Sequence, residues 1–213
     1  VLNRTTTVNN PAGKRITYSY DALGQRSSMI DPDGGRFTYS YDAAGRLACL
    51  KNPQSDRTTF VYDAAGRRTL KRLANGTRAS FSYDAADCLT RLANIKSTGV
   101  TISSFDYKCD DVGNRTRVVE SNGDRVTWVY DATYQLTAER RSGANAYANT
   151  FTYDAAGNRT VLNAGGSRTT TTYDAANQIV YALDSSGRTT YIFDANGNQA
   201  IVEQPDGNRT TNT

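Results

Sequence analysis

The segment GGRFTYSYDAAGRL, residues Gly34–Leu47, is the most informative part of the sequence, because close copies of its central YDAAG recur along the chain. The same five letters stand at Tyr41–Gly45, Tyr62–Gly66 and Tyr153–Gly157. Related strings place the repeat aspartates at positions 21, 42, 63, 84, 110, 131, 154, 174 and 194, at intervals of 20–26 residues. A period of this length is typical of repeat proteins. We therefore interpret residues 1–213 as a single array of about nine repeats.

Each YD string is expected to form a tight turn. The aspartate accepts a hydrogen bond from the backbone two residues on, and the alanines adopt helical angles at little cost. The glycine supplies the positive φ that ends a type I turn with a G1 bulge. The turn residues predicted in this way are Tyr20, Asp21, Gly24, Tyr41, Asp42, Gly45, Tyr62, Asp63, Gly66, Tyr83, Asp84, Asp110, Gly113, Tyr130, Asp131, Tyr153, Asp154, Gly157, Tyr173, Asp174, Phe193, Asp194 and Gly197.

Three repeats replace the glycine of the turn. Asn177 and Asp87 tolerate the left-handed conformation, Asp87 less easily than Asn177. Tyr134 is a bulky residue at the same position, and we expect it to mark a distorted or longer loop.

A second turn is expected about half a period away from the first. A glycine stands eight residues before a repeat aspartate in several repeats, often within strings such as DPDGG: Gly13, Gly34, Gly76, Gly123 and Gly166. The segments between the turns alternate, as in FTYSYD, where Phe37, Tyr39 and Tyr41 share one face. Thr, Val, Tyr and Phe favour strands, and no segment shows sustained helical periodicity. The prediction is an all-β protein of β-hairpins of about 21 residues, stacked into a curved or spiral antiparallel sheet.

The charge composition follows from the repeat. The chain has 25 Lys and Arg against 21 Asp and Glu, a net charge of +4. Stacked hairpins would place the turn aspartates in a row, and arginines on either side of the turns are expected to neutralise it. These are Arg26, Arg46, Arg67, Arg115 and Arg159 after the turns, and Arg15, Arg36, Arg57, Arg78, Arg125, Arg168 and Arg188 before the strands.

The composition excludes several kinds of function. The chain contains no His, which removes Ser-His-Asp and Cys-His catalysis and histidine metal sites. The calcium-like strings at 31–35 and 194–198 lack the spaced carboxylates and closing Glu of an EF-hand loop, so no metal and no cofactor is expected. No apolar run approaches the roughly 20 residues of a membrane span. The interleaved Arg and Asp residues argue against nucleic acid as a partner.

The three cysteines are Cys49, Cys88 and Cys109. If the strands around 98–99 pair as a hairpin, opposite residues have numbers that sum to 197, and Cys88 and Cys109 satisfy this sum. A disulfide between them is one prediction. The other is that two small apolar residues pack as free thiols. A catalytic thiol is not expected without a histidine base.

These residues resemble the RHS/YD-repeat family, whose repeat reads approximately GxxxRYxYDxxGRL. Residues Gly34–Leu47 are close to this pattern, and the resemblance covers nearly the full chain. It implies long β-hairpins that spiral into a hollow shell. The family includes shell-forming subunits of insecticidal toxin complexes, polymorphic RHS toxins, wall-associated proteins and teneurins. In the toxins the shell holds a C-terminal effector, so the resemblance implies a non-enzymatic wall of a secreted bacterial protein with an effector cargo as partner.

An alternative function is a cell-surface adhesin or extracellular filament subunit. Copies of the chain would pair edge to edge, and the tyrosine rows would offer a surface to carbohydrate. A third class, a hydrolase or sugar-processing enzyme, lacks a nucleophile and base in this sequence. Secretion or cell-surface location is expected in the first two cases, although no signal peptide is visible.

Two further segments bear on the comparison with the family. DPDGG, Asp31–Gly35, has the letters of the family's autocleavage motif, but seven repeats follow it, and we interpret it as an ordinary turn. Residues 1–4 resemble the exit of a repeat, and Pro205–Arg209 resembles the start of a tenth. The repeat phase is therefore expected to be cut at both ends, as in an excerpt of a longer protein or a unit that joins others.

Overall fold

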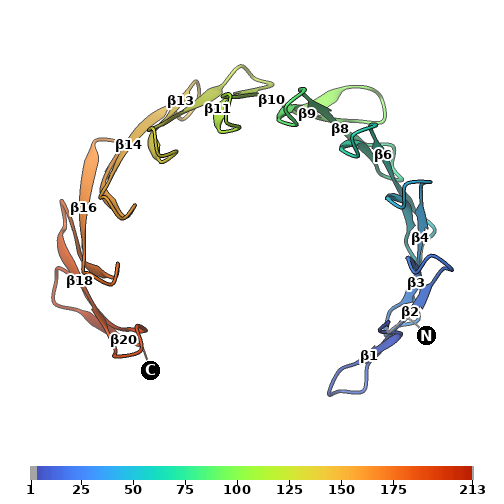
Figure 1. Ribbon diagram of the computed structural model, residues 1–213, viewed down its shortest axis with the longest axis horizontal. Helices are drawn as coiled ribbons and strands as arrows, with labels where there is room; N and C mark the ends of the chain where they lie inside the picture. The colour runs from blue at the N-terminus through green and yellow to red at the C-terminus, as the bar shows by residue number, and fades with distance from the viewer. Residues whose placement is uncertain (1–3, 213) are drawn as a thin grey trace. The chain divides into compact units, whose positions relative to one another are not determined.

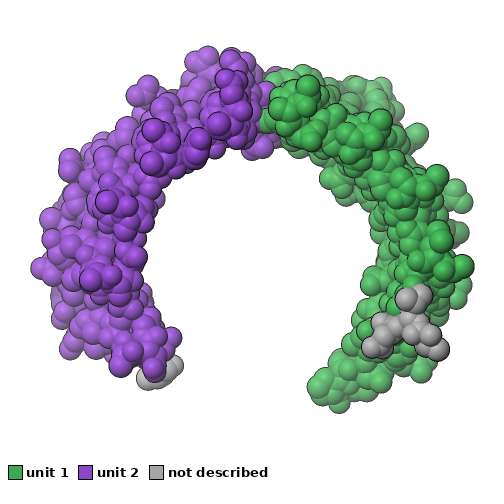
Figure 2. Space-filling view, viewed as in Figure 1, with its two compact units in different colours: residues 1–106 green, residues 107–213 purple. Residues whose placement is uncertain are grey.

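The computed structural model describes residues 4–212, and this part of the chain is all-β, with 20 strands and no helix. It divides into two compact units, residues 1–106 and 107–213 (Figure 2). The expectation for residues 1–3, that they continue a preceding repeat, lies outside the described residues. The prediction of an all-β fold made of antiparallel hairpins is confirmed.

The first unit contains ten strands that follow one another in chain order (Figure 1). The last of them, β10, ends at residue 109, three residues into the second unit. The strands are β1 (Thr7–Asn9), β2 (Arg15–Tyr20), β3 (Arg26–Ile30), β4 (Arg36–Tyr41), β5 (Leu47–Lys51), β6 (Arg57–Tyr62), β7 (Arg68–Arg72), β8 (Arg78–Tyr83), β9 (Leu89–Ile95) and β10 (Thr101–Cys109). Each of them from β1 to β9 pairs antiparallel with the next.

The second unit repeats this arrangement with ten further strands, again paired antiparallel with their successors. They are β11 (Arg115–Glu120), β12 (Arg125–Tyr130), β13 (Leu136–Ser142), β14 (Tyr147–Tyr153), β15 (Arg159–Ala164), β16 (Ser167–Tyr173), β17 (Ile179–Asp184), β18 (Gly187–Phe193), β19 (Gln199–Glu203) and β20 (Arg209–Thr211).

The register shifts by one residue beside each YD turn. Between β4 and β5, Ser40 lies opposite Cys49 whereas Tyr41 lies opposite Leu47, so one extra residue of β5 is accommodated there. The same shift recurs at the corresponding tyrosine of later hairpins, for example between Val61 and Tyr62. A bulge of this kind is what a type I turn followed by a positive-φ residue produces.

The core of each unit is thin. Only four hydrophobic residues among the described ones are buried: Ala93, Val118, Val126 and Ala138. No side chain in residues 4–212 is less than 2% exposed. Aromatic side chains such as Tyr39 and Phe60 are half-buried. Each unit is therefore a sheet one layer thick, and contacts between neighbouring hairpins have to supply what a second layer supplies elsewhere.

Candidate functional site

The YD turns are the feature that the repeats share, and Asp42–Arg46 shows their geometry. The Asp42 N–H donates to the Arg46 carbonyl at 2.9 Å, and the Gly45 N–H donates to the Asp42 carbonyl at 2.9 Å. The Asp42 carboxylate accepts from the N–H groups of Ala44 at 3.0 Å and Arg46 at 2.9 Å. Four backbone N–H groups of the turn thus find an acceptor inside it, which holds the connection without help from a core.

The same backbone bonds occur at all nine YD aspartates. The residue three positions later has a positive φ in each case: Gly24, Gly45, Gly66, Asp87, Gly113, Tyr134, Gly157, Asn177 and Gly197. The second set of turns uses the same pattern, as Asp31–Gly35 shows with bonds of 2.9 and 3.1 Å. The DPDGG segment is accordingly an ordinary turn of the sheet, and residues Gln204–Asn208 form another one.

Tyr134 contradicts the expectation of a distorted loop. It adopts a φ of 65°, and its N–H donates to the Asp131 carbonyl at 3.1 Å, as a glycine does in the other turns. Its side chain is 60% exposed, so the ring meets no steric obstacle outside the turn. The closing bonds of the turn, including those that the Asp131 carboxylate accepts, impose the left-handed conformation on a bulky residue.

The repeat tyrosines join each hairpin to the preceding one. The Tyr41 hydroxyl donates to the Arg26 carbonyl at 2.9 Å, and the Tyr62 hydroxyl donates to the Leu47 carbonyl at 3.0 Å. In both cases the acceptor is the fifth residue after the preceding YD aspartate. We call this bond the tyrosine clamp, and the other tyrosines that form it are Tyr83, Tyr130, Tyr153 and Tyr173.

The fourth residue after the aspartate makes a second link, which we call the turn clamp. Arg46 donates to the Asp42 carboxylate at 2.8 Å and, through Nη1, to the carbonyl of the next YD aspartate, Asp63, at 3.0 Å. Arg67 does the same with Asp63 and Asp84, at 2.7 and 2.8 Å. Uncharged residues also form this link, since Gln25 donates to the Gly45 carbonyl at 2.9 Å.

The arginines expected to neutralise the aspartate row divide into two groups. Arg46 and Arg67 pair with YD aspartates. Arg26, Arg115 and Arg159 lie one residue further on and stack over aromatic rings without an ion pair to a YD aspartate, with Arg26 4.5 Å from the Tyr18 ring centroid. The arginines before the strands form no ion pair with a YD aspartate in residues 4–212. Arg46 and Arg67 also lie over aromatic rings, 4.7 Å from the Tyr62 centroid and 4.9 Å from the Tyr83 centroid.

Hydrogen bonds lower the pKa of several turn aspartates. The backbone N–H and the guanidinium of Arg46 hold the pKa of the Asp42 carboxyl below its ordinary value. The Arg67 guanidinium is the main cause of the low pKa of Asp63. The carboxyls of Asp131, Asp154 and Asp194 have lowered pKa values for the same kind of reason. Carboxylates held ionised in this way are poor general acids, so the row is suited to holding turns rather than to proton transfer.

The cysteines differ in state. Cys49 is a half-buried free thiol, whereas Cys88 and Cys109 are both disulfide-bonded. The pairs Ser103–Asn94 to Asp106–Arg91 in the β9–β10 hairpin follow the sum of 197 on which the predicted disulfide depends. The pairing of Cys88 with Cys109 stays a prediction.

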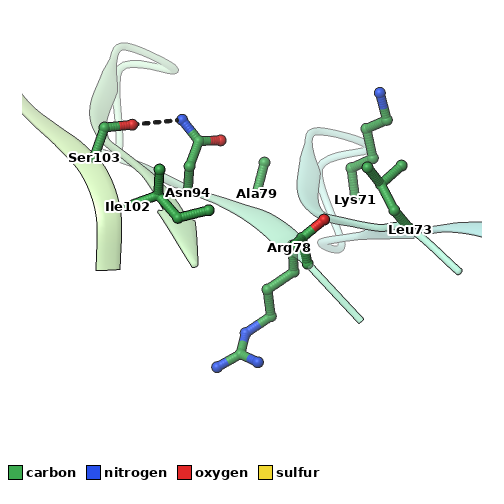
Figure 3. A pocket seen from close by; sticks show the side chains of 8 residues that line it. Lys71, Leu73, Arg78, Ala79, Asn94, Ile102 and Ser103 are labelled. Carbon is green, nitrogen blue, oxygen red and sulfur yellow. Dashed lines mark hydrogen bonds between the residues drawn. The ribbon is translucent and has the colours of Figure 1, made fainter. Parts of the chain in front are cut away.

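An open cavity of about 330 Å³ lies in the first unit (Figure 3). Leu73, Ala79 and Ile102 supply apolar lining, and the Asn94 amide donates to the Ser103 hydroxyl at 2.9 Å on one side of it. In Figure 3 the Arg78 guanidinium points away from this amide. The lining contains no carboxylate and no thiol, and its polar side chains are those of Lys71, Thr77, Arg78, Asn94 and Ser103.

One ionic cluster, formed by Arg141, Glu120 and Asp124, was not predicted from the sequence. Arg141 donates to both carboxylate oxygens of Glu120, at 2.6 and 3.0 Å, and to Asp124 at 2.9 Å. A side chain at Gly143 would collide with the Asp124 carboxylate. The three charged residues belong to one second-set turn and the strand beside it, and the sequence shows them only as single departures from the repeat. Their contacts link the end of β11, the turn before β12, and β13.

The comparisons with known proteins agree with this geometry. Residues 1–138 match the family model described as Teneurin YD-shell. The structure of the Tc holotoxin pore of Photorhabdus luminescens matches 93% of this chain with a TM-score of 0.63 and 18% identity. A TcdB2–TccC3 structure without its hypervariable C-terminal region matches 92% with a TM-score of 0.67 and 18% identity. This chain covers 14% and 13% of those chains. No curated protein matches.

Proposed function

The chain belongs to the Teneurin YD-shell family, and we propose that it is a non-enzymatic segment of the wall of a hollow β-shell. The shell would belong to a secreted bacterial protein and would enclose an effector cargo. The predicted membership of the RHS/YD-repeat family is confirmed by this match and by the fold shared with the Tc toxin structures. Among the described residues no helix is long and apolar enough to cross a membrane.

The observation that carries the proposal is the one-layer sheet. Its hairpins are joined through hydrogen bonds between neighbouring turns and strands, and it has almost no buried core. A repeat protein of this kind can extend over a large area, because each hairpin contacts mainly its neighbours. Such a sheet is suited to separating two spaces, and the described residues present no assembled catalytic group on it.

The proposal also concerns what the shell encloses. One of the similar structures is described as lacking a hypervariable C-terminal region, so the matched part of that protein accompanies a variable segment. By analogy, we propose that the shell to which this chain contributes encloses a polypeptide segment of variable sequence. The chain spans about one seventh of the similar chains, so enclosure would require more sheet than these 213 residues supply.

A protease-protection experiment tests the proposal. The longest natural polypeptide that contains this chain is digested natively with a nonspecific protease, and the fragments are identified by mass spectrometry. We expect the repeat segment and one further segment to survive together, and both to be cut after unfolding in urea. If every other segment is digested at once, the shell proposal fails. Regular fibres in electron micrographs would favour the filament alternative, and turnover of a glycan would contradict the non-enzymatic role.

A further inference from the structure

Successive strands of the first unit, from β4 to β8, each carry a cation at the end nearest a second-set turn. These residues, which we call the basic row, are Arg36 (β4), Lys51 (β5), Arg57 (β6), Arg72 (β7) and Arg78 (β8). The YD aspartates follow the opposite ends of the same strands. Cations and aspartates that alternate along the sequence are therefore separated in the folded unit.

The register of the sheet brings members of the basic row face to face. Lys51 lies directly opposite Arg57, and Arg72 lies directly opposite Arg78. Directly opposite residues of an antiparallel pair lie on the same face, and like charges in such pairs destabilise a sheet. Two unfavourable pairs therefore stand on neighbouring hairpins of one face.

Two threonines show that these pairs form one continuous row. Thr38 lies opposite Lys51, so Arg36, two residues before Thr38, is a diagonal neighbour of Lys51. Thr59 lies opposite Arg72 in the same way, which makes the first residue of β6 a diagonal neighbour of Arg72. With neighbouring strands about 4.8 Å apart, the five cations extend over about 19 Å.

No carboxylate neutralises the basic row within residues 4–212. None of its five members forms an ion pair there. The carboxylates of the adjacent second-set turns are engaged elsewhere, since Asp33 pairs with Lys14 at 3.8 Å and Asp56 accepts from the Asn52 amide at 3.3 Å. Asp31 accepts from backbone N–H groups of its own turn. The row thus presents positive charge to solvent without a counter-charge from the chain.

The face that carries the basic row lacks aromatic rings on β4–β8. The other strand residues of this face are neutral and small or aliphatic, as Thr38, Thr59 and Ser80 are. The rings lie on the opposite face, where Tyr39 and Phe60 belong to the alternate positions of their strands. Figure 3 shows this separation at one member of the row, because the Arg78 guanidinium points away from the Asn94 amide on the other face.

We propose that the basic row binds an acidic segment of polypeptide, whose carboxylates supply the charge that this face lacks. Four of the five cations are arginines, and a guanidinium binds a carboxylate through two parallel hydrogen bonds. An extended chain covers about 3.3–3.6 Å per residue, so about six residues would reach along the row. The proposal concerns this face whichever side of a wall it lines, and it does not depend on the proposed shell function.

A polypeptide fits this face better than other polyanions do. Proteins that bind single-stranded nucleic acid combine positive charge with aromatic side chains on which the bases stack, and rings also provide the apolar surface that sugars contact. The face of the basic row offers neither on β4–β8. Carboxylates on a flexible chain need only the charge and the donors that the row supplies.

Binding of a fluorescein-labelled peptide of consecutive glutamates to the full chain, measured by fluorescence anisotropy, tests the proposal. A Gly/Ser peptide of the same length is the probe control and should not bind. Raising the salt concentration from about 50 to about 200 mM should weaken binding of the glutamate peptide several-fold. Arg57→Gln combined with Arg72→Gln should weaken it by about tenfold or more, because two charge-assisted contacts are lost.

Arg125→Gln combined with Arg140→Gln is the matched control. These arginines are exposed, form no ion pair in the described part of the chain and lie in the second unit, and their replacement lowers the net charge equally. This variant should bind the peptide like the parent. The thermal midpoint of the Arg57/Arg72 variant should equal or exceed that of the parent, since each substitution removes one like-charge pair.

Three results would overturn the proposal. Full binding by the Arg57/Arg72 variant would remove the basic row from the interaction. An equal loss in both double variants would show that the peptide responds only to net charge. Tighter binding of oligothymidylate or heparin than of the glutamate peptide, lost in the Arg57/Arg72 variant, would assign the row to a nucleic acid or a polysaccharide instead.

Discussion

At the scale of single residues, the third position after each YD aspartate is the most restricted, because its residue must adopt a positive φ. Its φ lies between 61° and 90° in all nine turns. Glycine meets this demand without cost, asparagine and aspartate with little, and a tyrosine only under strain. The repeat pattern identified the position correctly, yet it could not show that the hydrogen bonds of the turn would hold Tyr134 in the same conformation.

Gly45→Val is expected to destabilise the chain by about 1–2 kcal/mol or more, because a β-branched residue at positive φ is strained. A side-chain carbon at this position would also approach the Gln25 amide, at 2.9 Å. Urea unfolding measures the effect. Gly45→Asn is the control and should lose much less, since Asn177 adopts a φ of 61° in its own turn. A valine variant as stable as the parent would show that the turn assignment is wrong.

Tyr134→Gly should stabilise the chain by about 1 kcal/mol, because it relieves the strain of a φ of 65° and removes an exposed ring that contributes little packing. The midpoint of chemical unfolding is the measurement. Ala132→Gly in the same turn serves as the comparison and should destabilise, since it adds flexibility where no positive φ is needed. A glycine variant at 134 that loses stability would mean that the ring makes a contact of value.

At the scale of the hairpin, the bulge decides which side chain links one repeat to the next. The fourth residue after the aspartate binds the following turn, as Arg46 does while it also lies over the Tyr62 ring, whereas the fifth stacks over the rings of Tyr18 and Tyr39, as Arg26 does. Both are arginines that follow a YD turn, and their one-residue offset gives them different partners. The sequence indicated a role for arginine near the aspartates, but the bulge selects the arginine that performs it.

Arg46→Ala should cost about 1 kcal/mol, because the Asp63 carbonyl loses its donor and the Asp42 carboxylate loses its cation. Arg46→Gln should retain most of the stability, since Gln25 forms the equivalent bond to the following turn with an amide. Thermal unfolding of the two variants side by side gives the comparison. If the glutamine variant is as weak as the alanine variant, the ion pair within the turn matters more than the link between turns.

At the scale of the whole molecule, stability comes from many similar junctions rather than from one core. The four buried hydrophobic residues among residues 4–212 cannot stabilise this part of the chain alone, and nearest-neighbour contacts between repeats make up the difference. The ionised turn carboxylates contribute to this stability, since the pKa values of several YD aspartates are lowered in the folded chain. The overall charge of +4 is a consequence of copying one repeat.

The chain should lose stability in acid. The pKa of the Asp42 carboxyl in the folded chain lies below its ordinary value of 3.8, so the unfolded chain binds protons more readily. The stabilisation from such carboxyls is complete above about pH 5 and is lost as the pH falls through the native pKa values. The urea midpoint at pH 6 and pH 3 measures it. A midpoint that is unchanged at pH 3 would contradict the role of these carboxylates.

Asp42→Asn combined with Asp63→Asn should weaken this pH dependence while keeping the turns. Asn52 shows that an amide oxygen can accept the bond that closes such a turn, since it takes the Asp56 N–H at 2.8 Å. An asparagine cannot titrate in this range, so the double variant should lose less stability between pH 6 and pH 3 than the parent. An equally steep pH dependence would place its cause in other carboxyls, such as Glu120 beside Arg141.

The period, the all-β hairpins, the two turns of each repeat and the family resemblance could all be predicted from the amino-acid sequence. These are local properties, because a tight turn and an alternating strand are encoded within about ten neighbouring residues. The carbonyl that each tyrosine binds, the arginine that links two turns, and the contacts of Arg141 with Glu120 and Asp124 are seen only in the folded chain. These contacts join residues 15 to 21 positions apart, and their partners depend on a register that a one-residue bulge shifts.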